Sequence, residues 1–561
     1  YRFTDWLNAE IKAGSDMYYT ETENKLYAGS PLQKNGRYSV GEKKFFENNF
    51  SFLLSAQKDQ LIDKFGGTLT FGGNLMERKS TGLDSSMGKL TVPDLFWITN
   101  GDKADLSVTQ TYSHKKINSL YGTLGINYDG WAFIDGTFRN DWSSSLSKKN
   151  RSFFYPSVSV SWVISDMVNK IGKGMPEWFT YAKARVSFAQ VGNDMDPYQL
   201  YNTYGIGSDG HTGGTTAWGN KTLYNEDVRS ELISSWEAGA EVKFFNNRLG
   251  VDVAWYKSNA RRQLLNIPMN NFSGYESMKV NAGDIQNTGL EIMLNARPIE
   301  TKDFSWDATV NFSTNKNKIV KLHDELKELV YGPTSFSSSY AMKLVKGGSI
   351  GDIYGKAFVR DAAGNIVYET EGDYKGLPLV EGDGNTVKVG NANPVFMMGW
   401  DHTFSYKGFS LYFLLDWRYG GKVLSQTQAE MDLYGVSEIT ADARDRGYVM
   451  LEGQQIDNVK GFYKNVVGGR AGVTEYYMYD ATNLRLREVS LSYNFSKKWI
   501  QKTKVLKDVQ LSFVARNLCF LYKKAPFDPD LVLSTGNDNQ GIEVFGMPTT
   551  RSLGFTLKCE F

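Results

Sequence analysis

Four histidines and two cysteines are the residues of this chain best suited to binding a metal or to nucleophilic chemistry: His114, His211, His323, His402, Cys519 and Cys559. The histidines are scattered and form no HExxH pattern, and the cysteines form no CxxC pair. No Walker-type phosphate loop is present either. We therefore expect no enzyme activity, no metal site and no other cofactor, and we expect both cysteines to be free, small apolar residues.

Two acidic, glycine-containing stretches, residues 361–365 and 381–385, resemble calcium-binding loops in composition. They lack the alternating ligand spacing and the bidentate Glu that a calcium loop needs. We interpret both as hairpin turns in surface loops. The segment Asn537 to Glu543 is interpreted in the same way, as a polar loop.

Aromatic side chains have a recognisable binding chemistry of their own, because flat rings stack on sugar faces and on peptide side chains. Several occur between the strand-like segments described below: Trp97, Tyr201, Tyr204, Trp218, Tyr224, Tyr275 and Tyr434. We select Trp218, Tyr224 and Tyr434 as candidate contacts for a ligand or a partner protein. The alternative is that large loops bury their own rings to hold their shape.

Asp416 and Arg418 are candidate ligand contacts of a second kind. They lie two residues apart in a strand-like segment and therefore face the same side of a sheet. The alternative is that such charges pair with each other or with another part of the protein.

The elements that must position these residues are β-strands. The chain contains 55 Gly and only 13 Pro, and 14% of its residues are aromatic, which favours strands and tight bends over helices. Alternation of apolar and polar residues predicts about sixteen strands. They cover residues 6–15, 45–57, 65–73, 119–130, 131–141, 156–164, 178–190, 235–245, 248–256, 289–299, 304–313, 395–406, 408–420, 487–495, 508–518 and 551–561.

The predicted connections alternate in length, as the turns and loops of an outer-membrane β-barrel do. The short ones are 58–63, 129–131, 165–177, 246–247, 300–303, 406–408 and 496–507. The others are 16–44, 74–118, 191–233, 257–288, 314–394, 421–480 and 519–550, with 142–155 as a short exception. The pattern predicts turns in the periplasm and long loops outside the cell.

Composition excludes several other classes of protein. The net charge is +1, which gives no reason to expect a nucleic-acid partner. The mean hydropathy is −0.40, and no stretch approaches 18 consecutive apolar residues, so the chain is not a helical membrane protein.

The final strand has two chemically different faces. Leu553, Phe555, Leu557, Cys559 and Phe561 alternate with small or polar residues. An apolar face that ends on an aromatic residue suits a strand in contact with a lipid bilayer. We expect Phe555, Leu557 and Phe561 to form the signal that the barrel-assembly machinery recognises, and residues 553–561 to pair with a first strand that this sequence does not contain.

Several segments resemble the SusC/RagA family of TonB-dependent outer-membrane transporters, which is typical of Bacteroidetes. They are DWSSSLSKKNRSFFYPSVSVSW (141–162), residues 246–269, VNAGDIQNTGLEI (280–292), GSIGDIYGKAFVRDAAGNIV (348–367), residues 389–421, LRLREVSLSYNF (484–495), residues 514–530 and residues 548–552. The resemblance implies an all-β, transmembrane antiparallel barrel of about 22 strands with a plugged lumen. Residues 1–561 would be the C-terminal part of that one barrel. The chain opens without a signal peptide, and the plug, the TonB box and the first strands have no match in it.

The resemblance also implies a function and a set of partners. We expect TonB-dependent import of oligosaccharides or oligopeptides across the outer membrane beneath a SusD-like lipoprotein lid. The TonB–ExbB–ExbD complex would act through the missing N-terminal part, and the candidate residues would contact cargo or lid. Two alternatives stay open, a passive sixteen-stranded porin and an adhesin or structural barrel subunit of an outer-membrane assembly.

Overall fold

The computed structural model describes residues 1–29, 34–324, 326–331, 340–381, 386–495, 500, 502, 505–533, 536 and 539–561. None of the helices in these residues combines the length and the apolar composition that crossing a membrane requires.

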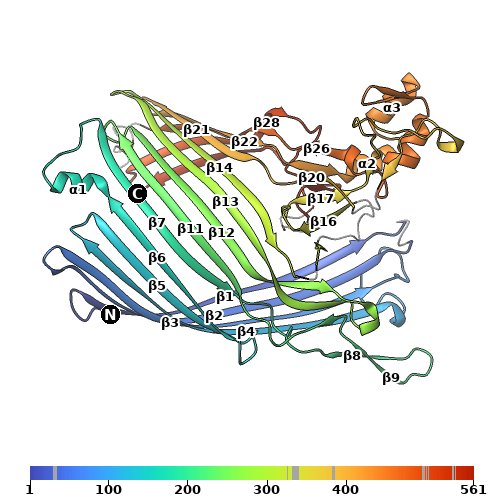
Figure 1. Ribbon diagram of the computed structural model, residues 1–561, viewed down its shortest axis with the longest axis horizontal. Helices are drawn as coiled ribbons and strands as arrows, with labels where there is room; N and C mark the ends of the chain where they lie inside the picture. The colour runs from blue at the N-terminus through green and yellow to red at the C-terminus, as the bar shows by residue number, and fades with distance from the viewer. Residues whose placement is uncertain are drawn as a thin grey trace. The chain divides into compact units, whose positions relative to one another are not determined.

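Sixteen long strands dominate the described residues, and each overlaps one of the predicted segments. They are β1 (Leu7–Leu26), β2 (Arg37–Ile62), β3 (Phe65–Met87), β4 (Leu106–Tyr128), β5 (Ala132–Ser143), β6 (Ser152–Val163), β7 (Phe179–Asn193), β11 (Glu231–Phe244), β12 (Leu249–Pro268), β13 (Ser277–Glu300), β14 (Phe304–Lys321), β21 (Phe396–Tyr406), β22 (Phe409–Tyr419), β27 (Asn483–Asn494), β28 (Asp508–Lys523) and β30 (Ser552–Glu560) (Figure 1). The prediction of an all-β chain is confirmed.

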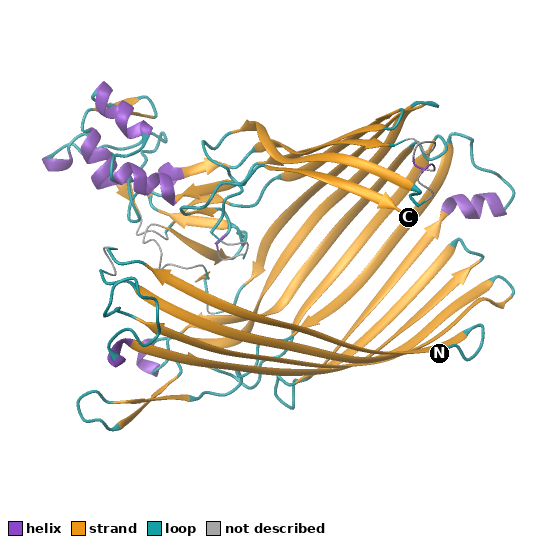
Figure 2. Ribbon diagram, turned by 180° about the vertical axis from the view of Figure 1, so that it is seen from behind, coloured by secondary structure: helices purple, strands orange, loops and turns teal. Residues whose placement is uncertain are grey.

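The chain forms two compact units, and each contains its own run of antiparallel strands. Unit 1 comprises Tyr1–Trp162, Val186–Ser235 and Ala260–Ala282, and unit 2 comprises the remaining described residues. In unit 1 each of the strands β1 to β6 pairs with the next in sequence, as Figure 2 shows for the long strands near the N-terminus. In unit 2 the pairing runs from β13 through β14, β21, β22, β27 and β28 to β30.

Apolar side chains at alternate positions of these strands are exposed. On β2, Phe50, Phe52 and Leu54 are 58%, 44% and 43% exposed. Phe52 pairs across the ladder with Gly73 of β3 and its ring covers that glycine, where a Cβ would lie 2.6 Å from a ring carbon. A face of exposed rings and aliphatic groups is the chemistry expected of a sheet that contacts lipid.

The predicted connections 16–44, 74–118 and 257–288 are wrong in their bounds, because the strands continue well into them. The β1–β2 ladder runs unbroken to the pair Leu26–Arg37, and the β3–β4 ladder to Met87–Leu106. Polar residues occupy both faces in parts of these extensions, such as residues 20–25, where Lys25 forms an ion pair with Glu23. The alternation of apolar and polar residues disappears where both faces of a strand contact water. The backbone hydrogen bonds of the ladder continue there nevertheless.

The tight turns lie where the sequence predicts them. Asp129-Gly130, Asn246-Asn247 and Lys407-Gly408 all have positive φ angles, which are typical of tight hairpin loops. The turn predicted at 58–63 is shorter than expected, because β2 continues to Ile62. Helix α1 (Ile164–Lys170) occupies part of the predicted connection 165–177.

The connections after β14 and β22 fold together into what we call the loop domain, the described residues of 328–391 and 422–480 together with β29. Its strands are β15 (Glu328–Val330), β16 (Tyr340–Val345), β17 (Asp352–Gly355), β18 (Ala357–Phe358), β19 (Val380–Glu381), β20 (Val387–Asn391), β23 (Lys422–Ser425), β24 (Val449–Leu451), β25 (Gln454–Ile456), β26 (Met478–Asp480) and β29 (Ile542–Glu543). Its helices are η3 (Gly372–Tyr374), α2 (Gln426–Leu433), α3 (Glu438–Arg446), α4 (Val459–Gly461), the π-helix η4 (Phe462–Val467) and η5 (Glu475–Tyr477).

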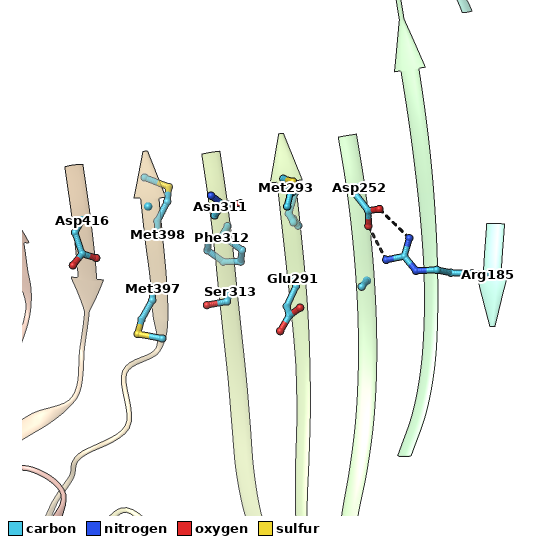
Figure 3. A pocket seen from close by; sticks show the side chains of 13 residues that line it. Arg185, Asp252, Glu291, Met293, Asn311, Phe312, Ser313, Met397, Met398 and Asp416 are labelled. Carbon is cyan, nitrogen blue, oxygen red and sulfur yellow. Dashed lines mark hydrogen bonds and ion pairs between the residues drawn. The ribbon is translucent and has the colours of Figure 1, made fainter. Parts of the chain in front are cut away.

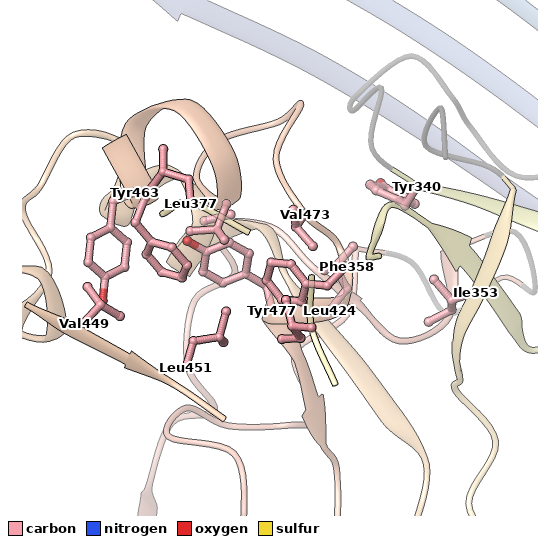
Figure 4. Close-up of a cluster of buried hydrophobic side chains, with 14 of the residues drawn as sticks. Tyr340, Ile353, Phe358, Leu377, Leu424, Val449, Leu451, Tyr463, Val473 and Tyr477 are labelled. Atoms are coloured by element: carbon pink, nitrogen blue, oxygen red, sulfur yellow. The ribbon is translucent and has the colours of Figure 1, made fainter. Parts of the chain in front are cut away.

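The loop domain has a hydrophobic core of its own. Tyr340, Ile353, Phe358, Leu424 and Tyr477 are among its buried side chains, and they come from segments more than a hundred residues apart (Figure 4). Arg360 ties the surface of the domain together by bonding both carboxylate oxygens of Glu452 and one of Glu475, each at 2.8 Å. The sequence predicts only long connections at 314–394 and 421–480, and it does not indicate that they fold together into a domain.

Unit 1 also carries smaller elements. They are η1 (Lys103–Asp105), the hairpin β8 (Tyr204–Ser208) and β9 (Thr215–Gly219), the short strand β10 (Thr222–Leu223), and η2 (Asn271–Ser273).

We expect Leu424→Ala to loosen the loop domain while leaving the long strands intact. Leu424 is 2% exposed, and removing a buried leucine side chain costs about 2–5 kcal/mol. Hydrogen exchange should therefore accelerate across 422–480 but not in β2 or β3. Val436→Ala is the control, since Val436 is 71% exposed on the same domain. Equal exchange in the two variants would contradict the assignment of this core.

Candidate functional site

The first candidate site is a depression on the sheet of unit 2, with a volume of about 530 Å³ (Figure 3). Asp416 of β22 lines it together with Arg185 of β7, Asp252 of β12, Glu291 of β13 and Ser313 of β14. Arg185 donates two hydrogen bonds to Asp252, at 2.8 and 2.9 Å, and this pair is drawn in Figure 3. Glu291 has no hydrogen-bond or ion-pair partner among the described residues. Apolar side chains such as Met293, Phe312 and Met397 line the depression as well, so it combines an apolar surface with three carboxylates and one arginine.

Asp416 and Arg418 both lie on β22, but they do not bond to each other. Asp416 accepts hydrogen bonds from the guanidinium of Arg487, one of them from Nε at 2.9 Å. Arg418 donates from Nη2 to the backbone oxygen of Ala392 at 2.8 Å. Both charges therefore have partners within the protein, and their role as ligand contacts stays a prediction.

Arg485 and Arg487 of β27 form a charge network that the sequence analysis did not identify. Arg485 is 1% exposed, and its Nη2 lies 2.6 Å from Asp528 and 3.3 Å from Asp530. Its guanidinium carbon lies 4.1 Å from the centre of the Phe520 ring. Arg487 also reaches Asp530, at 3.4 Å. These ion pairs hold the segment after β28 against the sheet.

A β-bulge at Arg487 accounts for this arrangement. The register of β27 shifts at this residue against β22 and against β28. A bulge re-aims the side chain of the strand that carries it. Two arginines at alternate positions of LRLREVSLSYNF were the one signal in the sequence, and a bulge leaves no trace in hydropathy.

The second candidate site is a cleft in the loop domain, about 490 Å³ in volume. We call it the Tyr434 cleft; Tyr434, Tyr463, Arg444, Lys460 and Lys464 line it, with Asp432 beneath. Tyr434 follows α2 and is 74% exposed, whereas Tyr463 is 5% exposed and belongs to the π-helix. Tyr434 lies in a separate depression from Asp416.

Asp432 is a buried carboxylate that organises this cleft. Its Oδ1 accepts hydrogen bonds from Ser437 at 2.5 Å and Gln428 at 2.7 Å, and its Oδ2 accepts one from Tyr477 at 3.0 Å. Burial raises the pKa of the Asp432 carboxyl, and the three hydrogen bonds oppose that shift without reversing it. Burial also raises the pKa of the Tyr477 hydroxyl, which therefore stays a donor.

Trp218 and Tyr224 lie in unit 1 and differ in exposure. Trp218 is 59% exposed on β9, and its ring covers Gly205 of β8, where a Cβ would lie 2.5 Å from the indole nitrogen. Only a glycine allows that close approach. Tyr224 is half-buried, and its backbone N–H donates to Asn202 at 3.1 Å. Trp218 therefore presents a supported, exposed ring, and Tyr224 presents less of its surface.

The interpretation of residues 361–365 as a hairpin turn is confirmed. Asp361 accepts from the backbone N–H groups of Ala363 and Asn365, at 2.8 and 2.9 Å. Residues 382–385 of the second stretch, and residues 537 and 538, lie outside the described residues. Glu543 accepts from Ser425 and Thr427, at 2.7 and 2.6 Å. In the described part of the chain, no three His, Cys, Asp or Glu side chains are grouped to hold a metal ion.

The last strand is exposed along its apolar face. Phe555, Leu557 and Phe561 are 79%, 64% and 71% exposed, and β30 pairs with β28. Cys519 and Cys559 are free.

Comparison with known proteins identifies the class to which this arrangement belongs. A family model described as TonB dependent receptor-like, beta-barrel matches residues 1–518. TonB-dependent receptor P3 of Formosa agariphila is 25% identical over 98% of this chain and 54% of its own length. TonB-dependent receptor SusC of Bacteroides thetaiotaomicron is 25% identical over 74% of this chain and 41% of its own length. The chain thus spans about half the length of the curated relatives it matches.

The fold agrees with these relationships. A solved structure of the RagAB peptide transporter superposes with a TM-score of 0.77 at 19% identity, covering 100% of this chain and 60% of that chain. The open state of the RagAB peptide importer gives a TM-score of 0.79, also at 19% identity, over 100% and 59% of the two chains. These relatives are named as receptors, transporters or importers, and not as enzymes.

We expect the stability of the α2–α3 region to increase as the pH falls from neutral. Because the folded-state pKa of Asp432 is raised above its unfolded value, the stabilising contribution is complete below about pH 4, and it is lost as the pH rises through the folded pKa. Hydrogen exchange of residues 426–446, corrected for intrinsic rates, measures this. Asp432→Asn should flatten the profile, and an unchanged profile would contradict the assignment.

Proposed function

The chain belongs to the TonB dependent receptor-like β-barrel family, and on this premise we propose that it forms part of an importer of oligopeptides or oligosaccharides. It is a β-barrel protein of the outer membrane. The observation that supports import best is the superposition of the whole chain on the RagAB peptide transporter. The family match over residues 1–518 agrees with it.

The described residues suggest how this chain contributes. The exposed apolar face of the strands provides the wall against lipid, and the depression at Asp416, which has both charged and apolar side chains, provides a surface for cargo. We propose that residues 1–561 are the C-terminal part of one barrel. The plug and the segment that contacts TonB would then be supplied by residues outside this chain.

A SusD-like surface lipoprotein is the proposed partner outside the cell. The loop domain is a folded body with a core of its own, which suits the docking of another protein. Energy would come from the inner-membrane proton gradient through TonB, ExbB and ExbD. We further propose that Phe555, Leu557 and Phe561 are recognised by the barrel-assembly machinery, since their exposed side chains lie along one face of the last strand.

Deletion of the gene tests the import proposal. We expect the deletion strain to lose uptake of labelled oligopeptides or oligosaccharides, and a protonophore to abolish uptake in the parent strain. Uptake that survives collapse of the proton gradient would contradict the TonB-dependent reading. An open, unplugged conductance of the protein from native membranes in planar bilayers would favour a porin instead.

Trp218→Ala tests the proposed contact with cargo within the same assay. Loss of one stacked ring should lower uptake about threefold to tenfold at limiting substrate. Tyr374→Ala is the matched control, because Tyr374 is 55% exposed at a turn of the loop domain. Equal uptake by the two variants would remove Trp218 from the candidate contacts.

Phe561→Ala tests the proposed assembly signal. We expect less folded protein at the cell surface, measured by heat-dependent gel migration and surface labelling. Phe545→Ala, at a loop aromatic that is 60% exposed, should assemble normally. Normal surface levels of the Phe561 variant would contradict the proposal.

A further inference from the structure

The Tyr434 cleft presents three cationic side chains that form no ion pair within the described residues. Arg444, Lys460 and Lys464 line it, and none of the three forms an ion pair with any described residue. Arg444 is held in place by one hydrogen bond from Nη1 to the backbone oxygen of Gly435, at 2.9 Å. Its other donors are left for a ligand, since a guanidinium carries five N–H groups.

The charge distribution of α3 directs its positive side into the cleft. Thr440 and Arg444 are four residues apart and share one face of the helix, and both line the cleft. The acidic residues Glu438, Asp442 and Asp445 fall on the opposite face at helical spacing. The helix therefore contributes a cation to the cleft and keeps its carboxylates away from it.

The cationic side chains that line the cleft, Arg444, Lys460 and Lys464, outnumber its carboxylates. Its one carboxylate, Asp432, already accepts hydrogen bonds from Ser437, Gln428 and Tyr477. The Thr440 hydroxyl donates to the backbone of its own turn. A carboxylate is acceptor-only, and it matches the arginine and the two lysines of this lining in both charge and hydrogen bonding.

The backbone conformation at the cleft also indicates a binding site. Tyr463 and Lys464 belong to the π-helix Phe462–Val467. Short π-helical turns are rare and are found frequently at functional sites. Here the π-helix brings a ring and a cation side by side at the cleft, next to the exposed ring of Tyr434.

We propose that the Tyr434 cleft binds the carboxylate side chains of an acidic peptide segment. The cations pair with the carboxylates, and the two tyrosine rings contact the aliphatic part of the bound segment. This binding goes beyond the proposed import, and it holds whether or not the barrel transports anything.

Binding of a defined peptide to the purified, detergent-solubilised protein tests the proposal. The probe is a fluorescein-labelled peptide with four glutamates, and its matched control has four glutamines. We expect salt-sensitive binding of the glutamate peptide alone, measured by fluorescence polarisation. The double variant Lys460→Gln/Lys464→Gln should bind about tenfold more weakly, since it removes two ion pairs at a partly exposed site.

Two further variants separate binding from folding. Lys375→Gln removes an exposed cation elsewhere on the loop domain and should leave affinity unchanged. Tyr434→Ala keeps all three cations and should still weaken binding. Heat-dependent gel migration confirms that each variant is folded.

Three results would overturn the proposal. They are equal affinity for the glutamine peptide, equal affinity of the double variant and the Lys375 variant, and equal or tighter binding of an oligogalacturonate of matched charge. The last result would assign the cleft to an anionic glycan. Failure of uptake assays with intact peptide binding would count against import and not against this site.

Discussion

The satisfaction of backbone hydrogen bonds within the sheet is the constraint on which the rest of this structure depends. A bilayer offers no water to an unpaired N–H or C=O group, so each spanning strand must be paired with its neighbours. The ladders from β1 to β6 and from β13 to β30 meet this demand residue by residue. Because pairing is fixed by the backbone, the side chains are free to differ on the two faces.

A sheet that faces lipid on one side cannot place its largest hydrophobic groups in a protein core. Phe50, Phe52 and Leu54 are accordingly exposed, and an extensive buried cluster lies instead among the described residues of the loop domain. Rigidity outside the membrane therefore comes from ordinary packing around residues such as Tyr477, and from hydrogen bonds such as those of Asp432. The depression at Asp416 is supported by the paired strands of the sheet. The Tyr434 cleft is supported by side-chain packing and hydrogen bonds in the loop domain.

The fold was predictable where one face of a strand is apolar and the other polar, because the sequence then alternates in hydropathy. It was not predictable elsewhere. Alternation located all sixteen long strands, and glycine or asparagine pairs located the tight hairpins. The strand extensions escaped detection because polar residues on both faces, as at residues 20–25, interrupt the alternation. The loop domain escaped because its core joins residues as distant as Tyr340 and Ile542. The sequence left open whether the loop aromatics are exposed or buried, and the structure shows Trp218 and Tyr434 exposed and Tyr224 half-buried. The partners of Asp416 depended on a bulge that no residue pattern indicates.

The position of Asp530 between two arginines restricts which substitutions this chain can accept during evolution. Asp530 lies within ion-pair distance of both Arg485 and Arg487, while Asp528 and Asp416 each serve one of them. A single exchange at any of these positions leaves a buried or half-buried charge unbalanced, which is costly. These five charged residues can therefore be replaced only in coordinated steps. The ion pairs that hold the segment after β28 against the sheet are consequently inherited as one unit.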